Sequence, residues 1–300
     1  MHTEQNDPSP GRDTVVRHER RRATAASEHD PELHYDRVMP AWRLLLGRNL
    51  HYGYFTTMRE NLDEATDELT RRVAKHARLG GGLEVLDVGC GDGQTSCFLA
   101  ENFGCRIVGI TTGKKGVTEA RRLAHSRVLT HTVTFEHRDG MDNGFPDDSF
   151  DRVWVMQSSH FMLDKKRLLD ECVRVLRPGG RFALSDIVLR APTSMIDVVT
   201  RRDEFLLLHR VFGRAKIESL EHYLSLADAS GLRLDVIEDV SAAAFPTMNG
   251  WRLNAIAHRE QVINLLGEIM WRDFLAACDV MERFWTEGRY GYAILAGTKK

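Results

Sequence analysis

The segment from residue 85 to residue 93 constrains the fold more than any other part of the chain. It reads Val-Leu-Asp-Val-Gly-Cys-Gly-Asp-Gly, an apolar run that ends in glycines at alternate positions, Gly89, Gly91 and Gly93. Since glycine tolerates positive φ and has no Cβ, a ligand can approach such a turn closely, beside the amides that begin the next helix. The segment therefore predicts a strand, a tight turn and a helix over 94–102 that together bind a nucleotide-like cofactor.

The spacing of these glycines bears on which cofactor is bound. Glycine clusters also mark ordinary turns, but here an all-apolar strand with an acidic residue precedes the cluster. A dinucleotide fingerprint reads G-x-G-x-x-G, with an acidic residue about 20 positions later for the ribose hydroxyls. This chain has G-x-G-x-G, and its next predicted strand ends in Thr111 and Thr112. Both departures weaken an interpretation as an NAD site.

Short apolar segments alternate with stretches long enough for helices between residues 83 and 188. This alternation predicts parallel β-α-β units with right-handed crossovers, and therefore a doubly wound α/β sheet. Ligands of such sheets bind beyond the carboxyl ends of the strands. Two more strands are expected towards the C-terminus. The predicted strands are 84–88, 106–110, 133–137, 152–157, 181–188, 232–238 and 291–296.

Five motifs follow one another along the same part of the chain. They are Gly-Cys-Gly-Asp-Gly at 89–93, Val-Gly-Ile-Thr-Thr at 108–112, Arg-Asp-Gly-Met at 138–141, Phe-Pro-Asp-Asp-Ser-Phe-Asp at 145–151 and Arg-Val-Leu-Arg-Pro-Gly-Gly at 174–180. In this order the chain resembles class I S-adenosylmethionine (SAM) dependent methyltransferases, over roughly residues 33 to 299. It is most similar to their small-molecule group, which contains sterol and tocopherol methyltransferases, rebeccamycin sugar O-methyltransferase and teleocidin C-methyltransferase.

The resemblance implies a Rossmann-like sheet of seven strands with an N-terminal helical flap and a helical lid. We expect a leader at 1–30 with no stable structure, the flap at 31–78, and a SAM-binding domain at 79–300 with the lid at about 190–230. The pattern predicts a helix over 33–46 interrupted by Pro40, and a helix after Asn61 capped through Glu64. It also predicts two helices within 193–230 and one long helical segment over 251–286.

The resemblance also implies which residues bind SAM. Asp87 suits the amine end of the methionine moiety, and Asp139 matches the residue that accepts a hydrogen bond from the adenine amino group. Threonines replace the usual acid at the ribose, as in related members of the group. The full predicted cofactor set is Asp87, Gly89, Cys90, Gly91, Thr111, Thr112, Asp139, Gly140, Met141, Gln157 and Ser158.

A second set of residues is predicted to act on the methyl acceptor. His160 and Asp186, separated by 26 positions, match the proposed catalytic pair of the rebeccamycin type of enzyme, in which a histidine removes the acceptor's proton. Tyr54 is expected to face the sulphonium of SAM, because aromatic faces stabilise cations. Where the group often has Glu-Ser, this chain has Gln157-Ser158, which leaves base-free methylation of carbon open. The predicted substrate pocket comprises Tyr52, Phe55, Phe161, Leu207, Phe212 and Trp251.

The amino-acid composition limits the kinds of partner that the protein can have. The chain has 300 residues, 42% hydrophobic content and a formal charge of -2, which disfavours a nucleic-acid substrate. No apolar stretch approaches the length of a membrane span, and no signal-peptide core is present, so we expect a cytoplasmic protein. The five cysteines lack C-x-x-C spacing, so we expect no zinc site. The N-terminal helices offer a surface for association with a second copy.

The expected function is therefore transfer of a methyl group from SAM to oxygen or carbon of a hydrophobic natural product, terpenoid, prenylated or polyketide-like. Met and Trp residues in the lid and C-terminal segments favour such a substrate over a sugar. Two alternatives stay open: an NAD(P)-dependent oxidoreductase, and a SAM-binding protein that serves as a scaffold or cyclisation catalyst.

Overall fold

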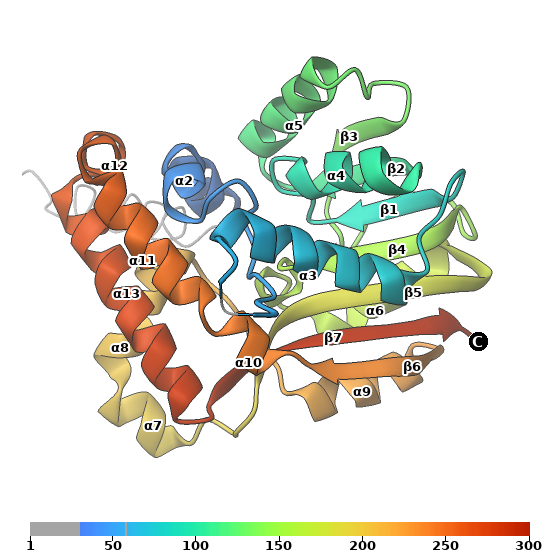
Figure 1. The fold of residues 1–300 in the computed structure, drawn as a ribbon. Helices are drawn as coiled ribbons and strands as arrows, with labels where there is room; N and C mark the ends of the chain where they lie inside the picture. Colours follow the sequence, from blue (N-terminus) through green and yellow to red (C-terminus); the bar gives the residue numbers. More distant parts are fainter. Residues whose placement is uncertain (1–30, 58) are drawn as a thin grey trace, which may run out of the picture.

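A computed structural model describes residues 31–57 and 59–300, so the predicted leader lies outside the described residues. The chain forms one seven-stranded sheet with the order β3-β2-β1-β4-β5-β7-β6 (Figure 1). Strands β1 to β5 run parallel, whereas β7 inserts antiparallel between β5 and β6. The predicted doubly wound α/β fold is confirmed. The strands are β1 Glu84–Val88, β2 Arg106–Thr111, β3 Val133–His137, β4 Phe150–Met156, β5 Leu176–Leu189, β6 Leu232–Asp239 and β7 Tyr290–Lys299.

Helices cover both faces of this sheet (Figure 1). Helices α3, α4 and α5 contribute to the core on one face, and α6 and α9 to the core on the other. None of the helices in the described ranges is long and apolar enough to cross a membrane. The helices are α2 Pro31–Leu45, α3 Leu62–Ala77, α4 Gln94–Phe103, α5 Lys114–Ser126, η1 Ser159–Phe161, α6 Lys165–Val175, α7 Met195–Thr200, α8 Arg202–Phe212, α9 Leu220–Ala229, α10 Ser241–Ala244, α11 Thr247–Ala257, α12 Arg259–Leu266 and α13 Glu268–Thr286.

Two predicted helical regions are more divided than expected. The region 193–230 holds three helices, α7, α8 and α9, instead of two, and 251–286 is broken at His258 and Gly267. Gly267 has φ +86, a left-handed conformation that ends α12. Helix α9 packs against α6 and β6, whereas α8 packs against α13. The part of the predicted lid that lies away from the sheet is therefore α7, α8 and the loop after them.

Helix α2 runs through Pro40 without the interruption that the sequence predicted. Proline at this position has no N–H to donate to the carbonyl of Asp36, four residues earlier. The Lys115 ammonium group donates a hydrogen bond to this carbonyl at 3.0 Å, and the Lys115 backbone N–H donates to the Asp36 side chain at 3.1 Å. The proline is therefore accommodated because a neighbouring helix satisfies the free carbonyl. These bonds also fix α2 beside the start of α5.

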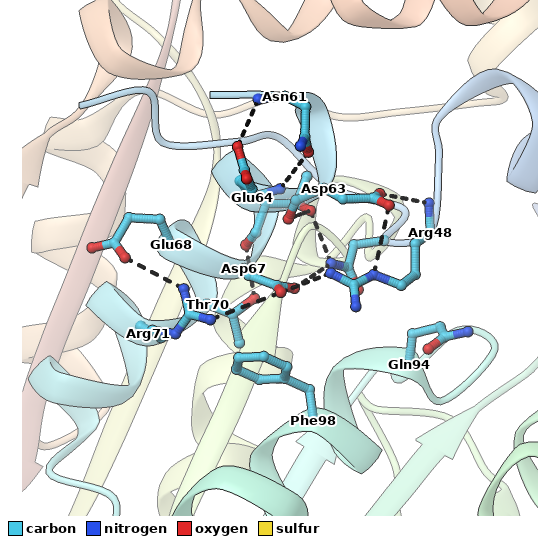
Figure 2. A network of polar contacts seen from close by, with 12 residues as sticks. Arg48, Asn61, Asp63, Glu64, Asp67, Glu68, Thr70, Arg71, Gln94 and Phe98 are labelled. Atoms are coloured by element: carbon cyan, nitrogen blue, oxygen red, sulfur yellow. Dashed lines mark hydrogen bonds and ion pairs between the residues drawn. The ribbon is translucent and has the colours of Figure 1, made fainter. Parts of the chain in front are cut away.

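The predicted cap of α3 is present: the Asn61 side chain accepts from the Glu64 N–H, and the Glu64 carboxylate accepts from the Asn61 N–H (Figure 2). The same helix holds the preceding loop. Arg48 donates to Asp67 at 2.7 Å, and Asn49 donates to Thr66 at 2.8 Å. These contacts anchor the segment that carries Tyr52 towards the carboxyl ends of the strands.

Candidate active site

Two adjoining cavities lie at the carboxyl ends of the parallel strands, where the fold predicts ligands. The smaller, about 260 Å³, is called the cofactor cavity below, and the larger, about 560 Å³, the acceptor cavity. Phe161 lines both. The structure brings together around the cofactor cavity most residues of the predicted cofactor set, namely Gly89, Gly91, Thr111, Thr112, Asp139, Gly140, Met141 and Ser158.

The glycine turn leaves no room for side chains. Gly89 has φ +84, and a Cβ on it would lie 2.3 Å from the Cβ of Ser158. Gly91 has φ +57, and a Cβ there would lie 2.8 Å from the Tyr35 hydroxyl. The backbone of Gly89 is held by donation to the Ile110 carbonyl at 2.8 Å. The bare backbone thus forms one wall of a cavity that suits an extended, nucleotide-like cofactor.

Helix α2 supplies lining residues that the sequence did not reveal. His34 and Tyr35 line the cofactor cavity, and His34 Nε2 contacts the Val211 carbonyl of α8 at 3.1 Å. Burial lowers the pKa of His34 to about 4, so this ring is neutral near pH 7. The helix was predicted, but only its packing on α5, α11 and α12 places these side chains over the glycine turn.

Two predicted cofactor residues lie behind the cavity wall. Asp87 is buried and accepts a hydrogen bond from the Ser96 hydroxyl at 2.5 Å. Cys90 is also buried, with its Cβ close to Gly109 of β2. Neither lines the cofactor cavity. Desolvation raises the pKa of Asp87 to about 7, so in the protein without ligand this carboxyl is partly protonated at neutral pH.

This raised pKa predicts a pH dependence of stability. The folded-state pKa of Asp87 lies above the ordinary value of 3.8. Its contribution to the free energy of unfolding is therefore greatest at low pH and is lost as pH rises towards 7. Between pH 6 and 8.5 the free energy of unfolding should fall by about 1.4 kcal/mol from this group. Asp87→Asn should remove this component. Urea unfolding of both proteins at the two pH values tests the prediction, and equal pH dependences would contradict it.

The acceptor cavity is mainly apolar and lies between the sheet, α2, α8, α11 and α13. Of the predicted pocket residues, Tyr52, Phe161, Phe212 and Trp251 line it, together with His160. Gln157, predicted for the cofactor, lines this cavity instead. Among the lining residues that the sequence did not predict are Trp42, Leu46, Leu50, Ile187, Phe205, Ile217, Met281 and Tyr290.

Three residues that were predicted to face the sulphonium or the substrate are not brought to either cavity. The Tyr54 ring lies under the Arg72 guanidinium at 4.5 Å from the ring centroid, and the Tyr54 N–H donates to the Ala65 carbonyl. The Phe55 N–H donates to the Ala243 carbonyl. Leu207 lies on the opposite side of α8 from the lining residues of that helix. The structure therefore gives no support for Tyr54 facing a sulphonium, or for Phe55 and Leu207 facing a substrate.

His160 and Asp186 form a close pair at the acceptor cavity. His160 follows β4 in the short helix η1, and Asp186 lies in β5, the neighbouring strand. His160 Nδ1 lies 2.7 Å from Asp186 Oδ1, and the His160 N–H donates to Asp186 Oδ2 at 3.1 Å. Asp186 is fully buried behind the ring, so it contacts no cavity itself. With Nδ1 engaged by the carboxylate, Nε2 is the ring nitrogen left for a ligand.

The Asp186 carboxylate is stabilised in its charged form. Burial alone would raise its pKa, but the His160 ring and hydrogen bonds from His160, Ser159 and the Ile187 N–H hold the pKa below its usual range. The Ser159 hydroxyl donates at 2.5 Å and is itself 2.8 Å from the Tyr223 hydroxyl. Because the serine proton goes to Asp186, Tyr223 donates to Ser159. This network fixes the orientation of the His160 ring.

Comparison with known proteins relates this geometry to an activity. Residues 86–184 match the family model described as "Methyltransferase domain". Over 267 residues the chain is 32% identical to the 27-O-demethylrifamycin SV methyltransferase of Amycolatopsis mediterranei (strain S699), with 88% of this chain and 95% of the relative covered.

Solved structures give matches over most of the chain. The [4+2]-cyclase SpnF is similar with a TM-score of 0.78 and 30% sequence identity, covering 91% of this chain and 96% of that one. The mycolic acid cyclopropane synthase CmaA1 complexed with SAH and CTAB gives a TM-score of 0.81 at 19% identity, covering 89% and 96%. At this identity the second match shows the fold alone.

Proposed function

Because this chain belongs to the class I SAM-dependent methyltransferases, we propose that it methylates a hydroxyl oxygen of a large, mainly apolar natural product, with His160 as general base. SAM is the cofactor, and the cofactor cavity is where the glycine turn would hold it. The observation that carries the proposal is the 2.7 Å contact between His160 Nδ1 and Asp186 Oδ1 at the wall of the acceptor cavity. Membership of this family removes the oxidoreductase alternative.

The residues of the acceptor cavity act in the following way. Asp186 accepts a hydrogen bond from the His160 Nδ1–H, which selects the ring tautomer with a lone pair on Nε2. Nε2 then accepts the proton of the substrate hydroxyl as the new oxygen–carbon bond forms. SAM supplies the electrophilic methyl group when it is bound. The apolar walls exclude water and align the hydroxyl, which suits an in-line displacement that depends on alignment.

The acceptor cavity supports a large hydrophobic substrate. Aromatic rings from six separate segments line it: Trp42, Tyr52, Phe161, Phe205, Phe212, Trp251 and Tyr290. Such walls bury flat or branched hydrocarbon surface and offer few partners for a sugar. The name of the rifamycin relative also points to a polyketide-like natural product. We infer oxygen as the acceptor atom, because the transfer step needs a base such as His160 when the acceptor is a hydroxyl and needs none when it is an alkene.

A panel of hydroxylated polyketides, terpenoids and phenols, incubated with methyl-labelled SAM, tests this function. We expect label in an apolar hydroxylated compound and in no sugar, with S-adenosylhomocysteine (SAH) formed in equal amount. Label appearing on carbon would show that the acceptor atom is assigned incorrectly. SAM binding without transfer to any compound would contradict the proposed activity.

A second candidate is cyclisation without methyl transfer. It is favoured by the match to the [4+2]-cyclase SpnF, at 30% identity over nearly the whole chain. Mass spectrometry of the same reactions separates the two functions, since cyclisation leaves the substrate mass unchanged and methylation adds one CH₂ unit. The buried carboxylate behind His160 favours proton abstraction, and hence methylation.

A further inference from the structure

Gln157 has an unfavourable backbone conformation next to the base. It directly follows β4, its N–H donates to the Ser185 carbonyl at 2.8 Å, and its φ is +50. Residues other than glycine rarely adopt this left-handed backbone conformation. Where they do, contacts with the surrounding structure hold them in it. Among the described non-glycine residues with positive φ, Gln157 is the one that lines either of the two cavities.

The Gln157 side chain is also incompletely paired. Its Oε1 is buried and accepts no hydrogen bond from any described residue. A buried amide oxygen without a donor is destabilising, and most such atoms in folded proteins find a partner. The side chain lies on the wall of the acceptor cavity, three residues before His160. Oε1 is enclosed in the ligand-free structure, so a ligand in this cavity can supply the missing donor once the carboxamide rotates its oxygen to the cavity surface.

We propose that Gln157 determines substrate specificity by accepting a hydrogen bond from a second O–H or N–H group beside the hydroxyl that is methylated. This inference rests on the proposed function. The reacting hydroxyl has a single proton, and that proton goes to His160 Nε2. The donor to Gln157 must therefore be another group of the substrate. The substrate class is an apolar molecule with two neighbouring hydroxyls, as in a catechol or a 1,2-diol.

The neutral amide also excludes a competing class of acceptor. A carboxylate at this position would attract an ammonium or stabilise a carbocation, whereas a carboxamide offers no charge. The negative charge nearest the base is Asp186, which is buried and already engaged by His160, Ser159 and Ile187. Since a carboxamide forms no ion pair with a cation, we expect the donor that Gln157 selects to be neutral.

Binding of two matched probes tests the proposal. We would titrate SAH-loaded enzyme with 4-tert-butylcatechol and with 4-tert-butylphenol, under reducing conditions, by calorimetry. Wild type should bind the catechol about five- to tenfold more tightly, the ratio that one additional hydrogen bond gives. In Gln157→Met, which keeps the length of the side chain and removes the acceptor, the ratio should fall to about one. Gln261→Met, an exposed glutamine on α12, is the control and should keep the wild-type ratio.

Thermal unfolding of the ligand-free variant provides an independent measurement. Removal of an unpaired buried oxygen should leave the Tm of Gln157→Met unchanged or raise it by about 2–4 °C. A marked fall in Tm would show that Gln157 serves the fold, and would overturn the proposal. So would equal binding of both probes to wild type, binding of neither, or a wild-type ratio retained in Gln157→Met.

These outcomes are separable from failure of the proposed function. An enzyme that binds SAH and prefers the catechol, yet transfers no label from SAM to any compound, would contradict methylation and leave the role of Gln157 intact. An enzyme that transfers label, but whose Gln157→Met variant keeps the wild-type ratio of the two affinities, would support methylation and contradict the role of Gln157.

Discussion

We expect His160→Ala to lower the rate of methyl transfer about 10³-fold while SAH affinity stays within about twofold of wild type. General bases contribute rate factors of about 10² to 10⁴. His160 lines the acceptor cavity and not the cofactor cavity, so its removal should spare cofactor binding. Single-turnover measurements with labelled SAM give the rate, and calorimetry with SAH gives the affinity.

A loss of stability has to be separated from a loss of chemistry in this variant. Removing the ring leaves the buried Asp186 carboxylate without its hydrogen bond from His160 Nδ1, which is destabilising. His160→Gln offers a second test, because a glutamine amide can still donate to Asp186 but cannot act as a base. His222→Ala, an exposed histidine on α9, is the matched control.

Both His160 variants should transfer methyl about 10³-fold more slowly than wild type and bind SAH normally, and added imidazole should restore part of the activity of His160→Ala. Turnover at the wild-type rate in either variant would remove His160 from the mechanism.

The sheet and the cofactor cavity were predictable because their determinants are local. The glycine turn requires positive φ angles and the absence of side chains at fixed positions. A short stretch of consecutive residues specifies both. The strands follow from short apolar runs, and β4 ends one residue before the prediction because Gln157 adopts a left-handed conformation. Motifs at the carboxyl ends of the strands then converge on one edge, as the topology requires.

The acceptor cavity was less predictable, because contacts between distant segments form it. Tyr54 was a reasonable aromatic candidate, but the Arg72 guanidinium in α3 holds its ring elsewhere. In α8 the rotation of the helix about its axis determines which leucines face the cavity. Leu206 and Leu208 line it, and Leu207 does not. A run of consecutive leucines does not reveal which face of the helix will line the cavity. Tyr35 reaches the glycine turn only through the packing of α2.

Gly89→Ala should reduce SAH affinity at least about 100-fold, which corresponds to about 2.7 kcal/mol. The new Cβ would lie 2.3 Å from the Ser158 Cβ and 2.5 Å from its hydroxyl oxygen, distances that real side chains do not adopt. Ser158 cannot simply rotate away, since its hydroxyl donates to the Val88 carbonyl at 2.7 Å. The turn itself must therefore move, and it forms the wall of the cofactor cavity.

Gly82→Ala is the matched control for this variant. Gly82 has φ +79, close to that of Gly89, but no atom lies within 4 Å of a Cβ built there. This variant should therefore lose only about 1–2 kcal/mol of stability through its left-handed backbone, with SAH affinity unchanged.

The double variant Gly89→Ala, Ser158→Gly removes the atoms that clash and should recover a large part of the SAH affinity. Equal loss of affinity in Gly82→Ala and Gly89→Ala would assign the effect to backbone strain alone. Failure of the double variant to recover any affinity would exclude contact with Ser158 as the reason that residue 89 has to be glycine.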